Sequence, residues 1–353
     1  MLRVRAPGRV NLIGDHTDYQ DGLCLPMAID REVEVRAEPR ADGRVVVRSD
    51  AVAGVVDLPA EGLPDPRVVR PEWGRPVAGI LRLLSQPGRA AIGFDAAVTS
   101  TVPLGSGLSS SAAFAVAMVI TTSRINDERI QPGSVASIAQ EAEQAATGVP
   151  CGAMDQMTSV FGRAGHALLL DCRTLQTEAI RIPPAAAVVV VHTGVARRLA
   201  DSAYAARRSA CEAAAARLGI GTLRDATMRD VADDPYARHV VSENARVLAF
   251  ADALRLTDLA RCGDLMVASH ASLRDDFGVS TVELDALVDA LTDAGAYGAR
   301  LTGAGFGGCA VALVASDQVD EVVAPAVARY RSATGLVPTP ITVRAVDGAG
   351  PVA

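Results

Sequence analysis

The chain of 353 residues contains no lysine, so every basic side chain apart from histidine is an arginine. A Walker A loop needs a lysine on the β- and γ-phosphates of its nucleotide, and a protein kinase needs a lysine on a strand. The sequence excludes both designs. A phosphate-binding site in this chain must take its positive charge from arginine, from backbone N–H groups or from a metal ion.

Other features are also missing. Six cysteines are scattered without a C-x-x-C pair, and the five histidines do not cluster with them. This pattern favours reduced thiols over a disulfide framework or a zinc site. No apolar run is long enough to span a bilayer, and residues 1–9 do not read as a signal peptide, so we expect a cytoplasmic protein without a membrane partner. The net charge of −7, without a basic run, argues against nucleic-acid binding.

The chain has the composition of a globular enzyme, with 49% hydrophobic and 21% charged residues. Its length suits two domains, and Pro183-Pro184 marks the expected boundary. Asp42-Gly43 predicts a hairpin, and residues 54–75 predict a surface excursion. Strands are expected at 2–5, 32–37, 45–47, 167–172, 187–192, 299–302 and 309–314, and helices at 73–84, 109–124, 134–147, 198–218, 237–262, 264–273 and 281–294. This mixture predicts an α+β protein.

The segment 103–113, Pro-Leu-Gly-Ser-Gly-Leu-Ser-Ser-Ser-Ala-Ala, is the most informative stretch. Its glycines and serines precede an apolar run that can continue as a helix. Glycine lets the backbone approach a ligand closely, and the N–H groups at a helix start attract anions. The segment therefore predicts a phosphate cradle, although an ordinary turn before a buried helix would also fit the pattern.

Three more clusters stand out against the aliphatic background. Residues 9–19 combine an arginine, two aspartates, a histidine and a tyrosine, a set of hydrogen-bonding groups that suits a polyol such as a sugar. Residues 148–156 place Asp155 among small and apolar side chains, as a candidate general base or, alternatively, a helix N-cap. Residues 303–308 form a second glycine-rich loop.

In this order, the motifs resemble those of the GHMP family of sugar and metabolite kinases, and within it the galactokinase group. The resemblance runs nearly end to end. It rests on residues 8–14, 16–19, 103–113, 151–152, 154–156, 204, 207–208, 211–212, 272–276 and 301–309. It implies a two-domain GHMP kinase fold, with a ribosomal S5 domain 2-like N-terminal domain at 1–183 and a ferredoxin-like C-terminal domain at 184–353. The active site is then expected in the cleft between the domains.

The resemblance also implies a reaction, in which ATP phosphorylates the anomeric hydroxyl of an aldose, with α-D-galactose as the first expectation. Asp155 matches the catalytic carboxylate, and Arg9 the arginine beside it. Ser111 and Glu143 match the pair associated with Mg²⁺, and Trp73 an aromatic near the adenine. The expected sugar contacts are Asp15, His16, Asp18, Gly152 and Tyr204, and the expected phosphate-loop residues are Pro103, Gly105, Ser106, Gly107, Leu108, Ser109, Ser110 and Ser111. The expected partners are a sugar and ATP, and the expected state is a monomer.

Some positions depart from the family pattern. Asp15 stands where the family usually has glutamate, and His192-Thr193 replaces Asn-Ser close to the expected sugar site. These departures leave open the same chemistry on another sugar, such as L-arabinose, an N-acetylated hexosamine or a uronic acid. A regulator that binds sugar and ATP without catalysis is a further alternative. It is disfavoured because the motif 107–113 is complete and Asp155 is present.

Overall fold

The computed structural model describes residues 1–86, 91–103, 105–195 and 200–352. Its largest sheet has six strands in the order β13-β1-β3-β6-β4-β5. All neighbouring pairs are antiparallel except β4 and β6, which run parallel. The strands are β1 (Leu2–Asn11), β3 (Pro26–Arg40), β4 (Arg44–Ser49), β5 (Val55–Pro59), β6 (Gly93–Ser100) and β13 (Gly350–Pro351).

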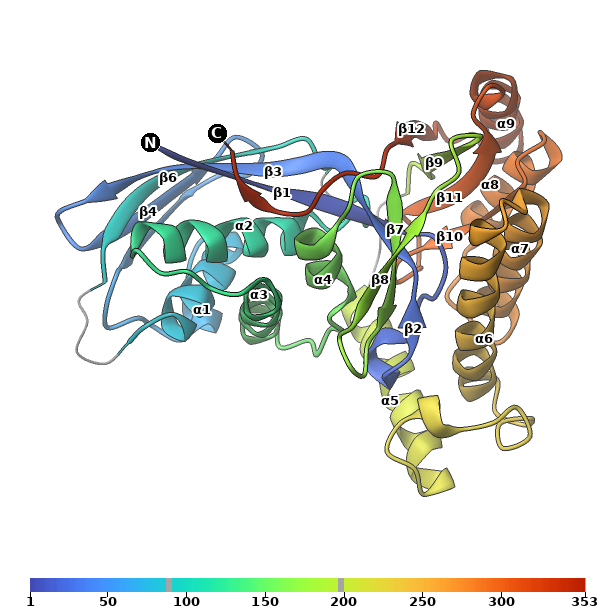
Figure 1. Ribbon diagram of the computed structural model, residues 1–353, viewed down its shortest axis with the longest axis horizontal. Helices are drawn as coiled ribbons and strands as arrows, with labels where there is room; N and C mark the ends of the chain where they lie inside the picture. The colour runs from blue at the N-terminus through green and yellow to red at the C-terminus, as the bar shows by residue number, and fades with distance from the viewer. Residues whose placement is uncertain (87–90, 104, 196–199, 353) are drawn as a thin grey trace.

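Four helices lie on one side of this sheet in two layers, the second and fourth against its strands and the first and third beyond them (Figure 1). They are α1 (Arg75–Leu83), α2 (Ser110–Ile125), α3 (Pro132–Thr147) and α4 (Met154–Phe161). Helix α2 is apolar on nearly all sides, and it packs against β1 and β3 as well as α3. A helix of this kind is stable only where neighbours cover it on all sides. Its burial fixes the direction in which its first turn points.

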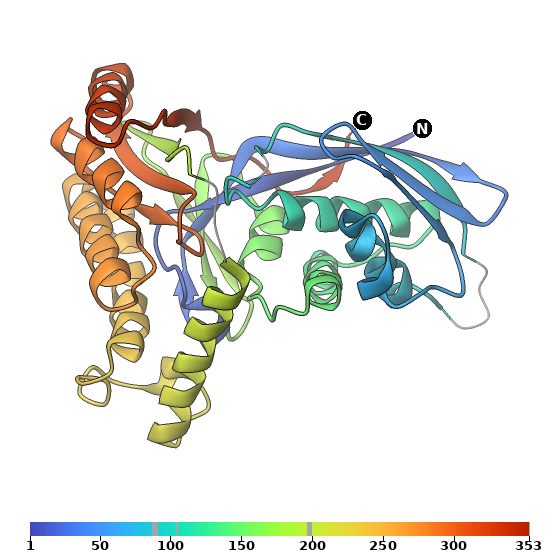
Figure 2. The same cartoon turned by 180° about the vertical axis from the view of Figure 1, so that it is seen from behind.

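A second sheet has four strands in the order β10-β11-β9-β12, all antiparallel. The strands are β9 (Ala186–His192), β10 (Gly298–Thr302), β11 (Cys309–Ala315) and β12 (Thr339–Val343). Helices α6 to α9 flank it, and α5 extends away from both sheets (Figure 2). These helices are α5 (Ala200–Leu218), α6 (Pro235–Arg255), α7 (Leu259–Asp275), α8 (Val282–Asp293) and α9 (Val319–Thr334).

A three-stranded sheet lies between these two parts, in the order β2-β7-β8. Its strands are β2 (Leu23–Cys24), β7 (His166–Asp171) and β8 (Thr177–Arg181). One aliphatic core runs from the largest sheet into the second, from Val4 and Val35 to Val190 and Val311. A second core, with Tyr330 at its centre, packs the other face of the four-stranded sheet against α8 and α9. The site elements are therefore held by continuous packing.

Short 3-10 helices punctuate the loops. They are η1 (Asp18–Gln20), η2 (Pro66–Val68), η3 (Glu72–Gly74) and η4 (Leu223–Asp225). Among the described residues, no helix combines the length and apolar character needed to cross a bilayer.

Most of the expected elements are present, and three expectations are wrong. The strands on either side of Asp42-Gly43 do not pair, because β6 inserts between β3 and β4. The excursion at 54–75 contains β5, whose Val56 and Leu58 are buried. The break between the two expected helices at 237–262 and 264–273 lies earlier, where Asp258 accepts a hydrogen bond from the Arg261 N–H and caps α7. The expected helix at 198–218 begins in residues outside the described part.

Candidate active site

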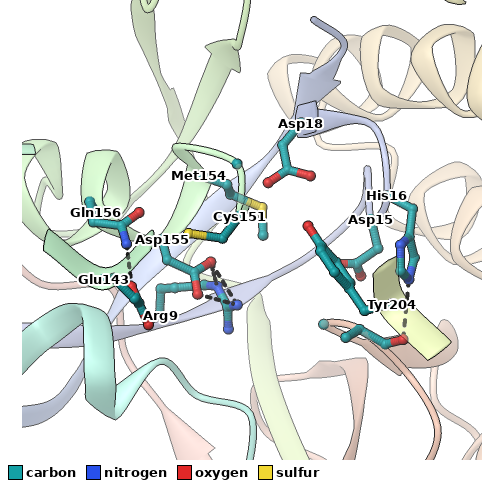
Figure 3. A pocket seen from close by; sticks show the side chains of 13 residues that line it. Arg9, Asp15, His16, Asp18, Glu143, Cys151, Met154, Asp155, Gln156 and Tyr204 are labelled. Carbon is teal, nitrogen blue, oxygen red and sulfur yellow. Dashed lines mark hydrogen bonds and ion pairs between the residues drawn. The ribbon is translucent and has the colours of Figure 1, made fainter. Parts of the chain in front are cut away.

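A polar cavity of about 140 Å³ lies where the two halves of the chain meet (Figure 3). Its walls come from β1, the loop after β1, α4, α5 and the glycine loop after β10. The lining residues are Arg9, Asp15, His16, Asp18, Glu143, Cys151, Gly152, Met154, Asp155, Gln156, Tyr204, Gly303 and Ala304. Every residue that the sequence predicted to be catalytic or sugar-binding is in this set.

Asp155 is held in place from two directions. It is the second residue of α4, in the first turn, where the helix dipole favours a carboxylate. The Arg9 Nε donates to Asp155 Oδ1 at 2.7 Å, and the Arg9 Nη2 donates to Oδ2 at 2.8 Å. The Ser109 hydroxyl also donates to Oδ2. This carboxylate therefore has a fixed orientation toward the cavity.

Arg9 connects three parts of the site although it is only 5% exposed. Its third nitrogen, Nη1, donates to the Gly107 carbonyl at 2.6 Å, and its backbone N–H donates to the Leu108 carbonyl at 3.1 Å. The bidentate pair with Asp155 is the geometry that makes an arginine–carboxylate contact strong and directional. Arg9 thus fixes the glycine loop and α4 relative to β1.

The loop at 103–111 has the backbone that its sequence predicts. Gly105 and Gly107 have positive φ angles of 68° and 80°, and the N-cap residue Ser109 is also left-handed, at 61°. The Ser106 hydroxyl donates to the Pro103 carbonyl at 2.7 Å, which tightens the turn. Helix α2 begins at Ser110, so its positive end lies beside the Arg9–Asp155 pair. Leu104 lies outside the described residues.

Ser111 and Glu143 meet at the edge of the cavity. The Ser111 hydroxyl donates to Glu143 Oε1 at 2.7 Å, and the Gln156 amide donates to Glu143 Oε2 at 2.6 Å. Burial raises the pKa of the Glu143 carboxyl. Within the described ranges, no group of three or more His, Cys, Asp or Glu side chains is placed to hold a metal. One hydroxyl and one carboxylate still suit Mg²⁺, which commonly takes one or two carboxylates along with substrate phosphates and water.

The loop after β1 presents Asp15, His16 and Asp18. His16 has a φ of 63°, its Nδ1 lies 3.0 Å from the Tyr19 hydroxyl and its Nε2 lies 3.2 Å from the Ala304 carbonyl. Burial lowers the pKa of His16 to about 3, so the ring is neutral at physiological pH. The second glycine loop therefore reaches the expected sugar site through Ala304.

Asp18 lies in an acidic environment. Burial, helped by the neighbouring carboxylates of Asp155 and Asp15, raises the pKa of Asp18 to about 7. Asp18 also lies directly against Gly152, because a Cβ at Gly152 would stand 1.9 Å from Asp18 Oδ2. Glycine is required at this position so that the carboxylate can occupy its place.

Tyr204 completes the aromatic wall of the cavity. Its ring centroid lies 5.7 Å from that of His16 and 5.4 Å from that of Tyr19. Tyr204 comes from α5, which also packs against α6 and the 3-10 helices η1 and η4. One of the expected sugar contacts is thus supplied by the second half of the chain.

Trp73 lies in a second, larger cavity of about 470 Å³, which is mainly apolar. The cavity is lined by Val33, Ser49, Ala51, Val52, Glu72, Trp73, Arg75, Pro76, Val98, Ser100, Ser110, Ser111, Phe114, Ala146 and Thr147. Trp73 stands edge-on to Phe114, with the ring centroids 6.0 Å apart, and its Nε1 donates to the Ala53 carbonyl at 3.0 Å. Ser111 lines this cavity and Glu143 the polar one, so their hydrogen bond marks the junction between the two.

Sequence reasoning assigned no role to Arg300, which bonds to Asp15 from the strand β10. A signal was present, because an arginine inside an otherwise apolar strand must find a partner for its charge. The sequence also predicted only a phosphate-binding role for Ser109, whereas the Ser109 hydroxyl donates a hydrogen bond to Asp155. His192, expected close to the sugar site, ends β9 and accepts a hydrogen bond from the Gly194 N–H at 3.0 Å. In the described part of the chain, His192 is not among the residues lining either cavity.

Comparison with known proteins finds relatives along the whole chain. The family models described as "GHMP kinases N terminal domain", "Galactokinase galactose-binding signature" and "GHMP kinases C terminal" match residues 76–163, 2–39 and 250–332. The galactokinase of Roseiflexus sp. (strain RS-1) is 45% identical over 99% of this chain and 92% of its own length. The galactokinase of Chloroflexus aurantiacus is 46% identical over 98% of this chain and 92% of its own length.

Solved structures show the same relationship. A crystal structure of Lactococcus lactis galactokinase complexed with galactose superposes with a TM-score of 0.91, at 30% identity, and covers 99% of this chain and 94% of that one. A mevalonate kinase shares the fold, with a TM-score of 0.71 at 17% identity, over 98% of this chain and 100% of that one. The relatives match over nearly their whole length, and the cavity residues apart from Tyr204 lie within the segments that the family models match. The chain therefore belongs to the GHMP kinase family, within its galactokinase group.

Proposed function

We propose that the protein transfers the γ-phosphoryl group of ATP to the anomeric hydroxyl of α-D-galactose, giving galactose 1-phosphate and ADP. The observation that carries this proposal is the position of Asp155. Its carboxylate is held by Arg9 and lies between a cavity rich in hydrogen-bonding groups and a glycine loop at a helix start. A base between a hydroxyl-bearing ligand and a phosphate cradle is what phosphoryl transfer to a sugar requires.

The sugar occupies the polar cavity in this proposal, with hydroxyls bonded by Asp15, His16, Asp18 and Tyr204 and with its ring close to Gly152. The charge of the cavity favours a neutral aldose. Asp15, Asp18, Glu143 and Asp155 line it, and Arg9 is the lining cation. A uronic acid would bring a further negative charge among these carboxylates, which is disfavoured at such short range.

In this proposal, ATP spans the region between the polar cavity and the apolar cavity. Its phosphates lie along residues 103–111, where backbone N–H groups at the start of α2 face an anion. Its base occupies the apolar cavity beside Trp73, which Ser110 and Ser111 also line. This placement explains how a kinase can lack lysine, because the helix start, Mg²⁺ and Arg9 share the positive charge.

Ser111 and Glu143 are the residues that would hold Mg²⁺. Their oxygens are already 2.7 Å apart at the junction of the two cavities, next to the proposed phosphate site. Bound there with ATP, the ion would neutralise charge on the transferring phosphates.

The reaction follows from the geometry around Asp155. The anomeric oxygen forms a bond to the γ-phosphorus as the bond from that phosphorus to the β–γ bridging oxygen breaks. The hydroxyl proton passes to the Asp155 carboxylate and from there to solvent. Arg9 stabilises the negative charge on the transferring group while it keeps Asp155 oriented.

The organisation of the whole chain completes the proposal. The chain forms two domains, at 1–183 and 184–353, with the site in the cleft between them. The start of β9 at Ala186, just after Pro183-Pro184, supports this boundary. The final strand β13 then returns to β1 in the first domain. We further propose a monomeric, cytoplasmic enzyme whose partners are the sugar and ATP alone.

The test is ADP release from Mg-ATP across a panel of aldoses, with Asp155→Asn as the control for catalysis. The panel contains D-galactose, L-arabinose, N-acetylgalactosamine, galacturonic acid and D-glucose. We expect the highest kcat/KM with galactose, and a loss of about 10²-fold or more in kcat in the variant. A higher kcat/KM for another aldose would transfer the same mechanism to that sugar. Tight binding of galactose and ATP without turnover would make the protein a regulator.

A further inference from the structure

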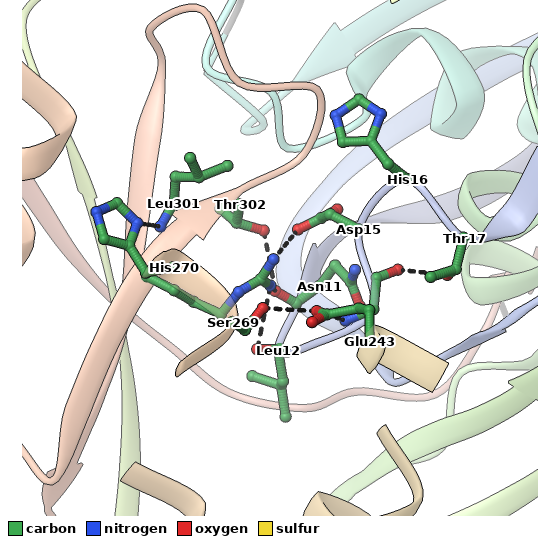
Figure 4. A network of polar contacts seen from close by, with 12 residues as sticks. Asn11, Leu12, Asp15, His16, Thr17, Glu243, Ser269, His270, Leu301 and Thr302 are labelled. Atoms are coloured by element: carbon green, nitrogen blue, oxygen red, sulfur yellow. Dashed lines mark hydrogen bonds and ion pairs between the residues drawn. The ribbon is translucent and has the colours of Figure 1, made fainter. Parts of the chain in front are cut away.

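Behind the polar cavity lies a buried ion pair that joins the sugar-facing loop to the second sheet (Figure 4). The Arg300 Nη2 donates to Asp15 Oδ2 at 2.7 Å. Arg300 is 0% exposed and Asp15 is 2% exposed. Asp15 lines the cavity, whereas Arg300 does not. The two residues therefore form a pair with one member in the site and the other entirely behind it.

We infer that Arg300 is a positioning residue, which holds the Asp15 carboxylate for a sugar hydroxyl and so sets sugar affinity rather than the rate of phosphoryl transfer. This inference rests on the proposed function and adds a residue to it. Arg300 cannot touch the sugar itself, so any effect that it has on the sugar must pass through Asp15 or through the loop that carries it.

The remaining contacts of Arg300 point the same way. Its Nη1 donates to the Leu12 carbonyl at 3.2 Å and to the Asn11 carbonyl at 3.4 Å. All of its partners therefore belong to residues 11–15, the segment that leads from β1 into the sugar-facing loop. Its Nε is buried and has no hydrogen-bond partner among the described residues.

Helix α6 also holds this segment. The Glu243 carboxylate, 0% exposed on α6, accepts a hydrogen bond from the Gly14 N–H at 2.9 Å and another from the Ser269 hydroxyl at 2.6 Å. The His239 ring, also on α6, lies 3.1 Å from the Asp15 carbonyl. The backbone on either side of the Asp15 side chain is thus fixed without Arg300. Besides its bonds to the Asn11 and Leu12 carbonyls, Arg300 contributes the direction of the Asp15 carboxylate.

A fixed carboxylate bonds a hydroxyl without first losing rotamer freedom, which strengthens binding. Arg300 holds one oxygen, Oδ2, and this leaves Oδ1 to meet the sugar. Asp15 and Asp155 lie on opposite sides of the cavity in Figure 3. Loosening Asp15 should therefore weaken sugar binding and leave the reacting end of the cavity intact.

The experiment measures kcat and both KM values for the wild type and for Arg300→Lys, Asp15→Asn and the double variant. Arg300→Lys keeps the charge but loses the directed guanidinium contact. We expect the KM for galactose to rise about tenfold, with kcat and the KM for ATP changed less than about threefold, in line with a charged hydrogen bond. In the Asp15→Asn background, the same lysine substitution should have no further effect on the KM for galactose.

Thr302→Val is the matched control. Thr302 lies on the same strand and donates to the same Asn11 carbonyl, at 2.9 Å, and the hydrogen bonds among the described residues include none between Thr302 and Asp15. We expect its KM for galactose to stay within about twofold of the wild type. If Arg300→Lys does not fold, the comparison of Asp15→Asn with Asp15→Asn/Arg300→Gln replaces it, and equal KM values for galactose support the proposal.

Two results would overturn the positioning role. One is a loss in Arg300→Lys that falls equally on kcat and on both KM values, and the other is a loss of the same size with Asp15→Asn present. The galactose assignment is tested separately, by wild-type turnover across the panel of aldoses. If another aldose has the highest kcat/KM, the same variants are measured with that sugar. The galactose assignment and the positioning role of Arg300 are then tested separately.

Discussion

Arg9 and Asp155 are 146 positions apart in the sequence, and they meet through two hydrogen bonds of 2.7 and 2.8 Å. Arg9 lies on β1 of the largest sheet, and Asp155 lies in the first turn of the short helix α4. The glycine loop joins them, because Arg9 donates to the Gly107 carbonyl and Ser109 donates to Asp155. Hydrogen bonds therefore join the proposed proton acceptor, the arginine beside it and the proposed phosphate-binding loop.

Arg9→Lys should reduce kcat by about 100-fold and leave the KM for the sugar nearly unchanged. A lysine keeps the charge but cannot hold both carboxylate oxygens and the Gly107 carbonyl together. Steady-state kinetics test this. Arg3→Lys is the control, because Arg3 lies on the same strand and pairs with Glu34 at the surface. Equal losses in the two variants would contradict the role given to Arg9.

Gly152→Ala should raise the KM for the sugar by about tenfold or more. The added Cβ would lie 1.9 Å from Asp18 Oδ2 and 2.3 Å from its Cγ, so Asp18 must leave its place. The KM for the sugar rises because the added methyl group overpacks the site and because the hydrogen bond from Asp18 to the sugar is lost. Gly133→Ala, with nothing within 4 Å of its added Cβ, should have normal kinetics. A normal KM in Gly152→Ala would show that Asp18 does not bind the sugar.

Asp18→Asn should gain stability over the wild type as the pH rises from about 4 to 7. The pKa of Asp18 is raised from its ordinary value of 3.8 to about 7, so the unfolded chain ionises first and the wild type loses stability across this window. Asparagine does not ionise, so the variant has no such pH-dependent loss of stability. Arg9 and the Tyr19 N–H oppose the shift, and burial with Asp155 and Asp15 outweighs them.

Thermal unfolding at several pH values measures this gain. We expect the difference in Tm between Asp18→Asn and the wild type to grow by at least about 2 °C up to pH 7 and then to stay level. Asp42→Asn is the control, because a surface contact with Arg40 lowers the pKa of Asp42 to about 2. That variant should show no such gain. If the difference in Tm between Asp18→Asn and the wild type shrinks with rising pH, folding does not raise the pKa of Asp18 and the prediction is wrong.

Glu143→Gln should raise the Mg²⁺ concentration needed for half-maximal activity by about tenfold, and the KM for the sugar should stay constant. The amide keeps the shape and can still bond to Ser111, but it loses the negative charge that attracts the cation. Titration of activity with MgCl₂ at fixed ATP tests this, and chelation should abolish turnover. Glu141→Gln lies exposed on the same helix and should match the wild type. An unchanged Mg²⁺ requirement in Glu143→Gln would remove it from the metal site.

The sequence was a good guide where chemistry is local. The two glycine loops, the cluster at 9–19 and Asp155 could be identified because polar residues interrupt long aliphatic stretches. It was a poor guide where partners are distant. The insertion of β6 between β3 and β4 depends on pairing across a long connection, and nothing in the Asp42-Gly43 turn reveals it. Arg300 was missed for the same reason, because its partner Asp15 lies 285 positions away.

The pair between Asp15 and Arg300 also constrains how the two halves of this chain can be recombined. A chimaera joined at Pro183-Pro184 would take Asp15 from one parent and the residue opposite it from the other. Glu243, which holds the Gly14 N–H, would be exchanged in the same step. Such a hybrid can retain its sugar pocket only if the second parent supplies a cation at position 300 and an acceptor at position 243. The first half must therefore come with a second half whose residues at positions 243 and 300 fit its loop at 14–15.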